Sequence, residues 1–258
     1  MFLEMHIKSK ELGKRTQVNV LLPNDGGEAG APFKTLWLLH GLSDDHTAWM
    51  RNSDIARYAS RRRLAVIMPA GDRSWYSNTA YGMNYFDYLT RELPAICRAT
   101  FKSLSERRED QIIAGLSMGG YGALKAALTY PERYGACISL SGAVDVTRKG
   151  RPSRLDEWRS IFGFDLESPL ALQGSEHDLM ALASRCQREG ATLPRIYMWC
   201  GEDDSLLSAN RELDAHLTSL GVGHHFGISE GDHTWPWWAL HIGNALDWVL
   251  DGEKEGEG

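Results

Sequence analysis

A serine between two glycines is the strongest chemical signal in this sequence. The motif GLSMG at residues 115–119 follows the apolar run 111–114 and precedes a run of helical character. A strand that turns sharply into a helix crowds its own backbone, so the positions beside the serine need residues without a Cβ atom. The serine then stands above the sheet at a helix N-terminus, where the helix dipole favours negative charge. This context predicts that Ser117 is a nucleophile.

A serine hydroxyl needs a base to activate it, and the base needs a carboxylate to orient it. When the serine lies on a strand-to-helix turn of this kind, the chain order is serine, acid, histidine. The late loop EGDHTW places His233 between an apolar run and a helical run. We therefore expect His233 to be the base.

The acid is expected in a loop after an earlier strand. The apolar run 196–200 ends in GEDD at residues 201–204, which offers three carboxylates. We expect Asp204 to be the acid, and Asp203 is the alternative. Asp145, after the preceding apolar run, is a third and less favoured candidate. At least two of the three acidic residues in the turn must then be solvated residues at the start of the next helix.

Ester cleavage through a serine also needs two N–H donors for the oxyanion of the intermediate, each worth roughly 3–4 kcal/mol of the barrier. One donor is expected from the residue after the nucleophile, Met118. The other is expected from the turn HGL after an early apolar run, and the sequence predicts the N–H of Leu42. His40 precedes the nucleophile in the chain, which favours an orienting role for it over that of a base.

Four residues near these positions are expected to form the substrate site. His40 and Gly41 belong to the oxyanion turn, Trp75 lies in the long loop GDRSWYSNTAYG, and Trp235 follows the expected base. Binding sites are commonly lined by aromatic side chains, so we predict substrate contacts for all four. The sequence contains no metal-ligand spacing and no nucleotide motif, so we expect neither a metal nor a cofactor.

The alternation of apolar and amphipathic segments indicates the fold class. Apolar runs lie at 17–22, 35–39, 64–68, 111–114, 137–140, 196–200 and 225–229, and helical patterns lie at 47–61, 83–101, 118–130, 206–220 and 234–250. Buried strands that alternate with helices predict an α/β fold, with a mainly parallel twisted sheet and helices on both faces. Segments 2–9 and 15–22 flank a turn-like ELGK and predict an antiparallel edge.

Residues 1–250 are expected to form one domain, because single α/β domains commonly reach the length of this 258-residue chain. Residues 142–192 break the alternation and are rich in Arg, Ser, Gly and acidic residues. We expect a lid-like insertion there, and the alternative is a long solvated connection. Residues 251–258 contain few apolar side chains and are expected to be a disordered tail.

The composition narrows the possible partners and location. The net charge of −6 argues against a nucleic acid or an anionic membrane as a partner. The N-terminus lacks a signal-peptide pattern, and no apolar run approaches the ~20 residues that span a bilayer. The four scattered cysteines fit a reducing compartment. We expect a soluble, cytoplasmic protein that acts on a small-molecule ester.

Five segments occur in a familiar order: HGLSDDHTAW, WYSNTAYGMNYFDYLTRELP, GLSMGGYGALKAAL, WCGEDD and EGDHTWPWW. They resemble the tributyrin esterase and acetyl esterase branch of the esterase D-like α/β-hydrolases, over nearly the whole chain. The resemblance implies the α/β-hydrolase fold, the triad Ser117, Asp204 and His233, and the oxyanion donors Leu42 and Met118. It also implies short acyl substrates, acetyl to butyryl, with acetylated sugars or feruloyl-type aryl esters in some relatives. Dimers or tetramers are common in the family.

The sequence therefore predicts a serine carboxylesterase that forms an acyl-enzyme. Its rivals are an S-formylglutathione thioesterase, an acyltransferase on the same fold and a hydrolase-fold binding module without catalysis. S-formylglutathione hydrolases typically carry histidines around the elbow serine, whereas this elbow is GLSMGGYG. A binding module would usually have lost a member of the triad. The family often has a bulky aromatic residue after the acid, whereas this chain has Ser205, which keeps Asp203 open as the acid.

Overall fold

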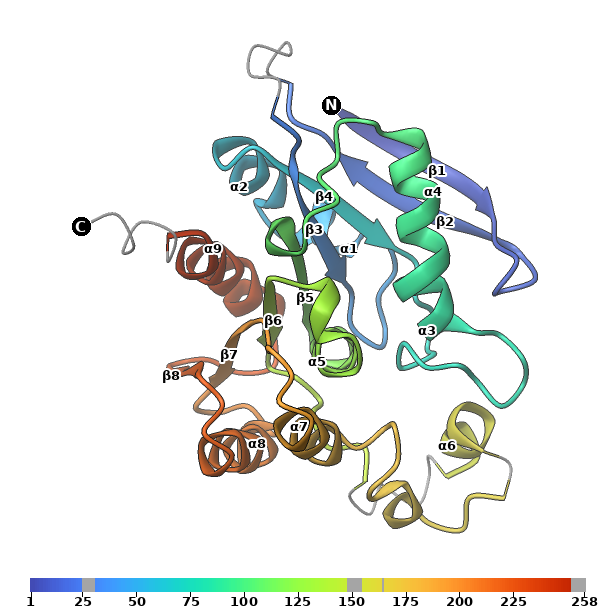
Figure 1. Cartoon of the computed structure of the whole chain (residues 1–258), viewed down its shortest axis with the longest axis vertical. Helices are drawn as coiled ribbons and strands as arrows, with labels where there is room; N and C mark the ends of the chain where they lie inside the picture. Colours follow the sequence, from blue (N-terminus) through green and yellow to red (C-terminus); the bar gives the residue numbers. More distant parts are fainter. Residues whose placement is uncertain (25–30, 148–154, 164, 252–258) are drawn as a thin grey trace.

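A twisted sheet of eight strands runs through the part of the chain that the computed structural model describes, residues 1–24, 31–147, 155–163 and 165–251 (Figure 1). The strands are β1 (Phe2–Lys8), β2 (Arg15–Leu21), β3 (Lys34–Leu39), β4 (Leu64–Pro69), β5 (Gln111–Leu116), β6 (Ala136–Leu140), β7 (Arg195–Gly201) and β8 (His224–Ser229). Their order in the sheet is β1-β2-β4-β3-β5-β6-β7-β8.

The strand directions confirm the expected architecture. β1 and β2 pair antiparallel, and β2 also pairs antiparallel with β4. The pairs from β4 through β3, β5, β6 and β7 to β8 are all parallel. Every residue of β4, β5 and β6 is buried, as in a parallel sheet covered on both faces. The sheet is that of an α/β-hydrolase with an antiparallel N-terminal edge.

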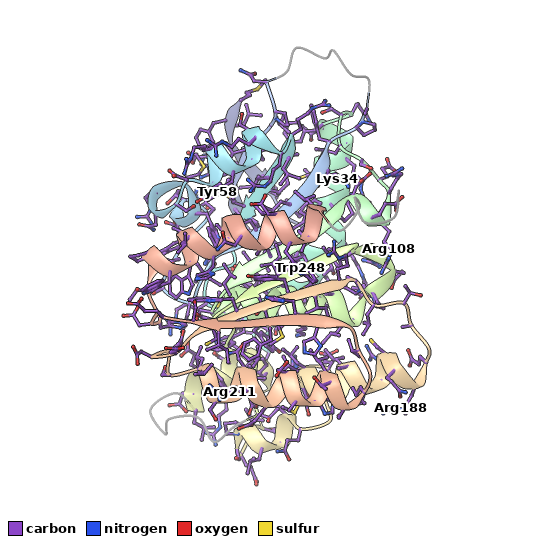
Figure 2. All side chains as sticks on the ribbon, turned by 90° about the vertical axis from the view of Figure 1, so that its left-hand side faces the viewer. Lys34, Tyr58, Arg108, Arg188, Arg211 and Trp248 are labelled. Atoms are coloured by element: carbon purple, nitrogen blue, oxygen red, sulfur yellow. The ribbon has the colours of Figure 1, made fainter. Side chains whose placement is uncertain are left out.

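Helices cover both faces of the sheet. One face carries α1 (Ala48–Asn52), α2 (Ile55–Arg61) and α9 (Trp235–Asp251), and the other carries α3 (Tyr85–Asp87), α4 (Leu93–Thr100), α5 (Met118–Thr129), α7 (Leu179–Arg188) and α8 (Leu207–Ser219). Figure 2 shows this layering from the β8 edge: Trp248 lies between α9 and the strands, while Arg188 and Arg211 lie on the helices of the opposite layer.

The alternation of side chains along each strand divides the core between the two layers. In β3, Leu36 and Leu38 pack on the α9 face, whereas Trp37 and Leu39 pack on the α5 face. This two-residue period is the geometric property of a strand. Because β3, β5, β7 and β8 run in the same direction, the loops that follow these strands lie at the same edge of the sheet.

Residues 142–192, where the sequence predicts a lid-like insertion, include a regular helix, α7 (Leu179–Arg188). α7 lies within 142–192, yet it packs against α5 and α8 as a regular crossover helix. Its buried residues Leu179, Leu182, Ala183 and Cys186 have helical spacing, and the Asp178 carboxylate caps its N-terminus. Polar residues between these positions hid the pattern in the sequence. The remaining insertion includes α6 (Leu155–Phe162) and a 3₁₀ turn at Pro169–Leu172.

The expected disordered tail lies outside the described residues beyond Asp251, and so does part of the insertion, residues 148–154. None of the described helices combines the length and apolar character needed to cross a membrane. The predicted helix at 47–61 is divided into α1 and α2, because Ser53 is extended with φ −144° and ψ 167°.

Candidate active site

Ser117 occupies a sharp turn between β5 and α5. Its backbone has φ 52° and ψ −117°, a left-handed conformation that a side chain rarely adopts. A Cβ atom on Gly115 would lie 2.3 Å from the carbonyl of Gly119, and one on Gly119 would lie 2.5 Å from the Leu39 carbonyl oxygen. Both positions therefore exclude any residue larger than glycine. The crowded backbone leaves the serine side chain partly exposed at the sheet edge.

Three side chains from three different loops form a hydrogen-bonded row at this edge. Ser117 Oγ lies 3.0 Å from His233 Nε2, and His233 Nδ1 lies 2.9 Å from Asp204 Oδ2. The loop after β7 supplies the aspartate, and the loop after β8 supplies the histidine. A parallel sheet brings these loops together although the serine and histidine are 116 residues apart. An imidazole held between a hydroxyl and a carboxylate is able to take the hydroxyl proton.

The Asp204 carboxylate is fully buried, whereas about a third of the His233 side chain is exposed. Burial alone would raise the pKa of Asp204. The hydrogen bonds from His233 and from the Leu206 N–H outweigh burial and hold this pKa below its usual value. Asp204 is therefore ionised when it faces the imidazole.

The other two candidate acids point elsewhere. Asp203 is exposed, and its backbone N–H donates to the Gly231 carbonyl at 2.9 Å. The Asp145 carboxylate accepts hydrogen bonds from the N–H and the hydroxyl of Thr147. Neither carboxylate hydrogen-bonds His233 in the described structure.

The two expected oxyanion donors lie on either side of the serine. Met118 is the first residue of α5, so its N–H has no partner inside the helix. Leu42 lies in the turn after β3 and lines the same pocket as Ser117. Among the described residues, none accepts a hydrogen bond from either N–H. Both groups are thus available to a ligand.

His40 does not line the pocket, in contrast to the prediction that it contacts substrate. Its side chain is 1% exposed, and backbone groups occupy both ring nitrogens. Nε2 accepts from the Gly71 N–H at 2.8 Å, so Nδ1 carries the proton and donates to the Gly41 carbonyl at 2.7 Å. Burial lowers the pKa of His40, which fits this neutral tautomer.

The bond from His40 orients a peptide group. The carbonyl of Gly41 and the N–H of Leu42 belong to one peptide, and they point in opposite directions because that peptide is trans. A proton donor fixed on the carbonyl therefore fixes the direction of the N–H. The sequence suggested an orienting role for His40, and this geometry favours it.

A pocket of about 570 Å³ opens in front of Ser117. It is lined by Gly41, Leu42, Ser43, Asp44, Trp75, Leu116, Ser117, Ala143, Ser205, Leu206, His233, Thr234, Trp235 and Trp238. Gly41, Trp75 and Trp235, for which the sequence predicts substrate contacts, are in the pocket wall. The sequence did not indicate Asp44, Ala143 or Leu206, because the paths of their loops decide which side chains face the cavity.

Three indole rings form the aromatic part of the wall. Trp75 has φ 53° and packs against Tyr121 of α5 and Trp158 of α6. Trp235 and Trp238 lie edge to face, with ring centroids 5.5 Å apart. Trp238 is buried in the core, and its ring centroid also lies 4.9 Å from that of His233. Trp238 therefore packs against one side of the imidazole.

A second polar cluster lies outside the pocket lining and contacts Trp75 through Tyr121 and Ser77. Lys125 of α5 is 2% exposed, and its Nζ lies 2.8 Å from Ser77 Oγ and 3.0 Å from His177 Nδ1. The Tyr121 hydroxyl donates to the His177 carbonyl at 3.0 Å. The sequence analysis missed this cluster, although a lysine inside the apolar helix YGALKAALTY was a usable signal.

The described residues contain no group of three or more His, Cys, Asp or Glu side chains arranged to hold a metal ion. The chemistry that the site supports with its own groups is proton transfer, nucleophilic attack and stabilisation of negative charge.

Comparisons with known proteins show which family the chain resembles. The family model described as "Putative esterase" matches residues 9–249. The chain is 33% identical to an acetyl esterase of Caldicellulosiruptor saccharolyticus, over 96% of this chain and 97% of that protein. Among solved structures it is similar to the fluorophosphonate-binding serine hydrolase FphF of Staphylococcus aureus, with 34% identity, a TM-score of 0.87 and coverage of 96% and 98%. A Staphylococcus aureus structure described as S-formylglutathione hydrolase FrmB has 33% identity, a TM-score of 0.83 and the same coverage.

Proposed function

Because the chain belongs to this esterase family, within the esterase D-like serine hydrolases, and is a carboxylic ester hydrolase, we propose that Ser117, His233 and Asp204 are its catalytic triad. We propose that its substrates are short-chain acyl esters, acetyl to butyryl. The observation that carries the assignment is the pair of hydrogen bonds, 3.0 Å and 2.9 Å long, that join the three side chains.

In the acylation step, Ser117 Oγ attacks the ester carbonyl carbon and its proton passes to His233 Nε2. The charge of Asp204 stabilises the imidazolium that forms, and its hydrogen bond to Nδ1 keeps the ring in the productive tautomer. His233 then returns the proton to the leaving alkoxide, and the alcohol departs. The acyl group remains on the serine as an ester.

In the deacylation step, water takes the place of the alcohol. His233 Nε2 accepts a proton from this water as its oxygen attacks the acyl carbonyl. The second intermediate collapses, the carboxylic acid leaves, and the proton returns to Ser117. The partial exposure of His233 supports this step, because water must reach the ring.

Both intermediates carry an oxyanion that the N–H groups of Leu42 and Met118 stabilise. The positive end of the α5 dipole adds to this stabilisation, since Met118 is the first residue of the helix. His40 is a positioning residue in this scheme, because it acts on the Leu42 N–H through the Gly41 carbonyl.

The preference for short acyl chains is supported by the pocket and by one relative. Trp75, Trp235 and Trp238 line the same pocket as Ser117 with bulky rigid rings, and we expect these rings to limit the length of acyl chain that fits there. The relative with 33% identity over nearly the whole chain is named an acetyl esterase. Assays of 4-nitrophenyl esters of increasing length should show the highest kcat/KM between acetyl and butyryl.

The direct test of the triad replaces the nucleophile. Ser117→Ala should lower kcat for 4-nitrophenyl acetate by about 10⁴-fold or more, because the acyl-enzyme can no longer form. Ser208→Ala is a matched control, since Ser208 is exposed on α8 and its hydroxyl donates to Glu212 of the same helix. Near-normal turnover by Ser117→Ala would exclude the proposal.

A second candidate, hydrolysis of S-formylglutathione, is favoured by the structural relative with that name. The same serine, histidine and N–H donors would cleave a thioester by the same steps. The kcat/KM for S-formylglutathione, measured beside that for 4-nitrophenyl acetate, decides between the two substrates.

A further inference from the structure

Asp44 is a charged residue of the pocket that the proposed chemistry does not use. It is partly buried and lines the pocket beside Gly41. A Cβ atom built on Gly41 would lie 3.3 Å from Asp44 Oδ2 and 3.8 Å from Ser117 Cβ. The carboxylate and the nucleophile therefore flank the same small space, next to the peptide that carries the Leu42 N–H.

The Asp44 carboxylate has no structural partner in the described part of the chain. Only its backbone N–H is engaged, by the Gly41 carbonyl at 3.2 Å. The neighbouring Asp45 is different: its carboxylate accepts from the N–H and the hydroxyl of Thr47 and lies 3.7 Å from Arg51. Turn geometry thus accounts for the carboxylate of Asp45 but not for that of Asp44.

Among the residues that the structure describes, no lysine or arginine balances Asp44 inside the pocket. The described lining residues include no lysine and no arginine, and Asp204 adds a second negative charge behind His233. An unbalanced carboxylate near the oxyanion site repels the negative charge that develops there, and this repulsion by itself slows the reaction. A role in substrate choice would account for a carboxylate at this position in spite of that cost. The interaction of this carboxylate with a second negative charge on the substrate is repulsive at every stage of the reaction.

We propose that Asp44 is a specificity residue that excludes carboxylate-bearing esters, so that the pocket selects neutral or cationic substrates. This inference rests on the proposed esterase function of the same site. It also separates the two candidate substrates, because the glutathione part of S-formylglutathione carries two carboxylates and one ammonium group. Asp44 disfavours that thioester relative to a neutral one.

The test compares matched pairs of esters that differ in one charge. Methyl 4-acetoxybenzoate and 4-acetoxybenzoate place the charge on the leaving group, and 4-nitrophenyl butyrate and 4-nitrophenyl hemisuccinate place it on the acyl group. For each pair, the ratio of kcat/KM for the anionic ester to that for the neutral ester is measured in the wild type and in Asp44→Asn. Differences in intrinsic reactivity cancel when the two proteins are compared.

We expect Asp44→Asn to raise this ratio on the order of tenfold in at least one pair, and the pair that responds shows which side of the ester faces Asp44. The wild-type ratio should also rise with added salt, because salt screens the repulsion. Asp45→Asn is the matched control and should leave both ratios at the wild-type value. It removes a neighbouring charge but keeps an oxygen that accepts from Thr47.

The proposal is overturned if Asp44→Asn leaves both ratios unchanged or if Asp45→Asn changes them as much. Ser117→Ala separates this failure from failure of the esterase assignment. If Ser117→Ala still hydrolyses the neutral esters, the proposed catalytic site is wrong. If Ser117→Ala is inactive and the ratios do not respond to Asp44→Asn, only the specificity role is wrong.

Discussion

Two clusters in this molecule each join a serine, a histidine and a charged side chain, and we propose a catalytic role for only one of them. At the sheet edge, His233 lies between Ser117 and the carboxylate of Asp204. Outside the pocket lining, the ammonium group of Lys125 lies between Ser77 and His177. The two clusters use opposite charges and differ in access to solvent.

The sign of the partner charge determines what each histidine can do. Asp204 stabilises a protonated His233, so that ring is suited to accept a proton from the serine. Burial, followed by the charge of Lys125, lowers the pKa of His177, so that ring stays neutral and acts as a hydrogen-bond acceptor. Burial also lowers the pKa of Lys125. We infer that the second cluster ties the insertion to α5 and so supports the wall that contains Trp75.

The largest expected effect comes from neutralising Asp204, the charged partner of His233 at the sheet edge. Asp204→Asn should lower kcat for 4-nitrophenyl acetate by about 10⁴-fold, because the amide favours the wrong imidazole tautomer. Asp203→Asn should keep wild-type kcat, since Asp203 is exposed and does not reach His233. Steady-state kinetics of both variants test the choice between these adjacent acids. A large loss with Asp203→Asn alone would reverse the assignment.

Removing Lys125, the charged residue of the buried cluster, should lower stability and leave catalysis nearly unchanged. Lys125→Ala leaves a cavity and unpaired groups on Ser77 and His177, and we expect it to lower the free energy of unfolding by about 2–4 kcal/mol. The kcat of the folded variant should change by less than about tenfold. Urea unfolding combined with kinetics measures both quantities. Lys125→Met, which refills the space, should lose less stability than Lys125→Ala.

A smaller effect on catalysis is expected from His40, which the proposal treats as a positioning residue. His40→Phe frees the Gly41–Leu42 peptide, so we expect kcat to fall by about 10- to 100-fold with little change in KM. His40→Gln keeps a donor and an acceptor and should recover part of kcat. An increase in KM with kcat unchanged would instead indicate a contact between His40 and the substrate.

The smallest expected effect is the pH dependence of stability that His177 contributes. Its pKa is lowered in the folded chain, so the unfolded chain binds more protons once the pH falls below the ordinary value of about 6.5. This residue therefore destabilises the fold as the pH falls, by about 1 kcal/mol between pH 7 and pH 5.5. In His177→Gln, the fall in unfolding free energy between pH 7 and pH 5.5 should be smaller by that amount. An unchanged curve would show that His177 is not held neutral.

The parts of the site that could be predicted from the sequence are those where the crowded backbone allows only particular residue types. The contacts that forbid a Cβ atom at Gly115 and Gly119 are the reason why the elbow was recognisable. The turn at 201–204 has consecutive acids, and a sequence does not show which of them points inward. The structure places Asp204 inward and Asp203 outward.

Features that depend on the path of long loops were not visible in the sequence. Lys125 and His177 meet across 52 residues, and the partner of a buried lysine leaves no local pattern. Asp44 and Asp45 are identical neighbours in the chain, yet only Asp44 faces the pocket. The sheet was predictable because apolar strands repeat regularly along the chain. The helix α7 was not predictable, because its place in the fold depends on packing against α5, which is distant in sequence.

The most direct measurement of the central claim is the site of covalent labelling by a fluorophosphonate probe. After labelling and digestion, peptide mass spectrometry should find the probe on Ser117 in the wild type, and His233→Ala should label far more slowly because the base is missing. Ser77, which is buried and hydrogen-bonds the ammonium group of Lys125, should remain unlabelled. Absence of label on wild-type Ser117, or label on another serine in an active enzyme, would contradict the account.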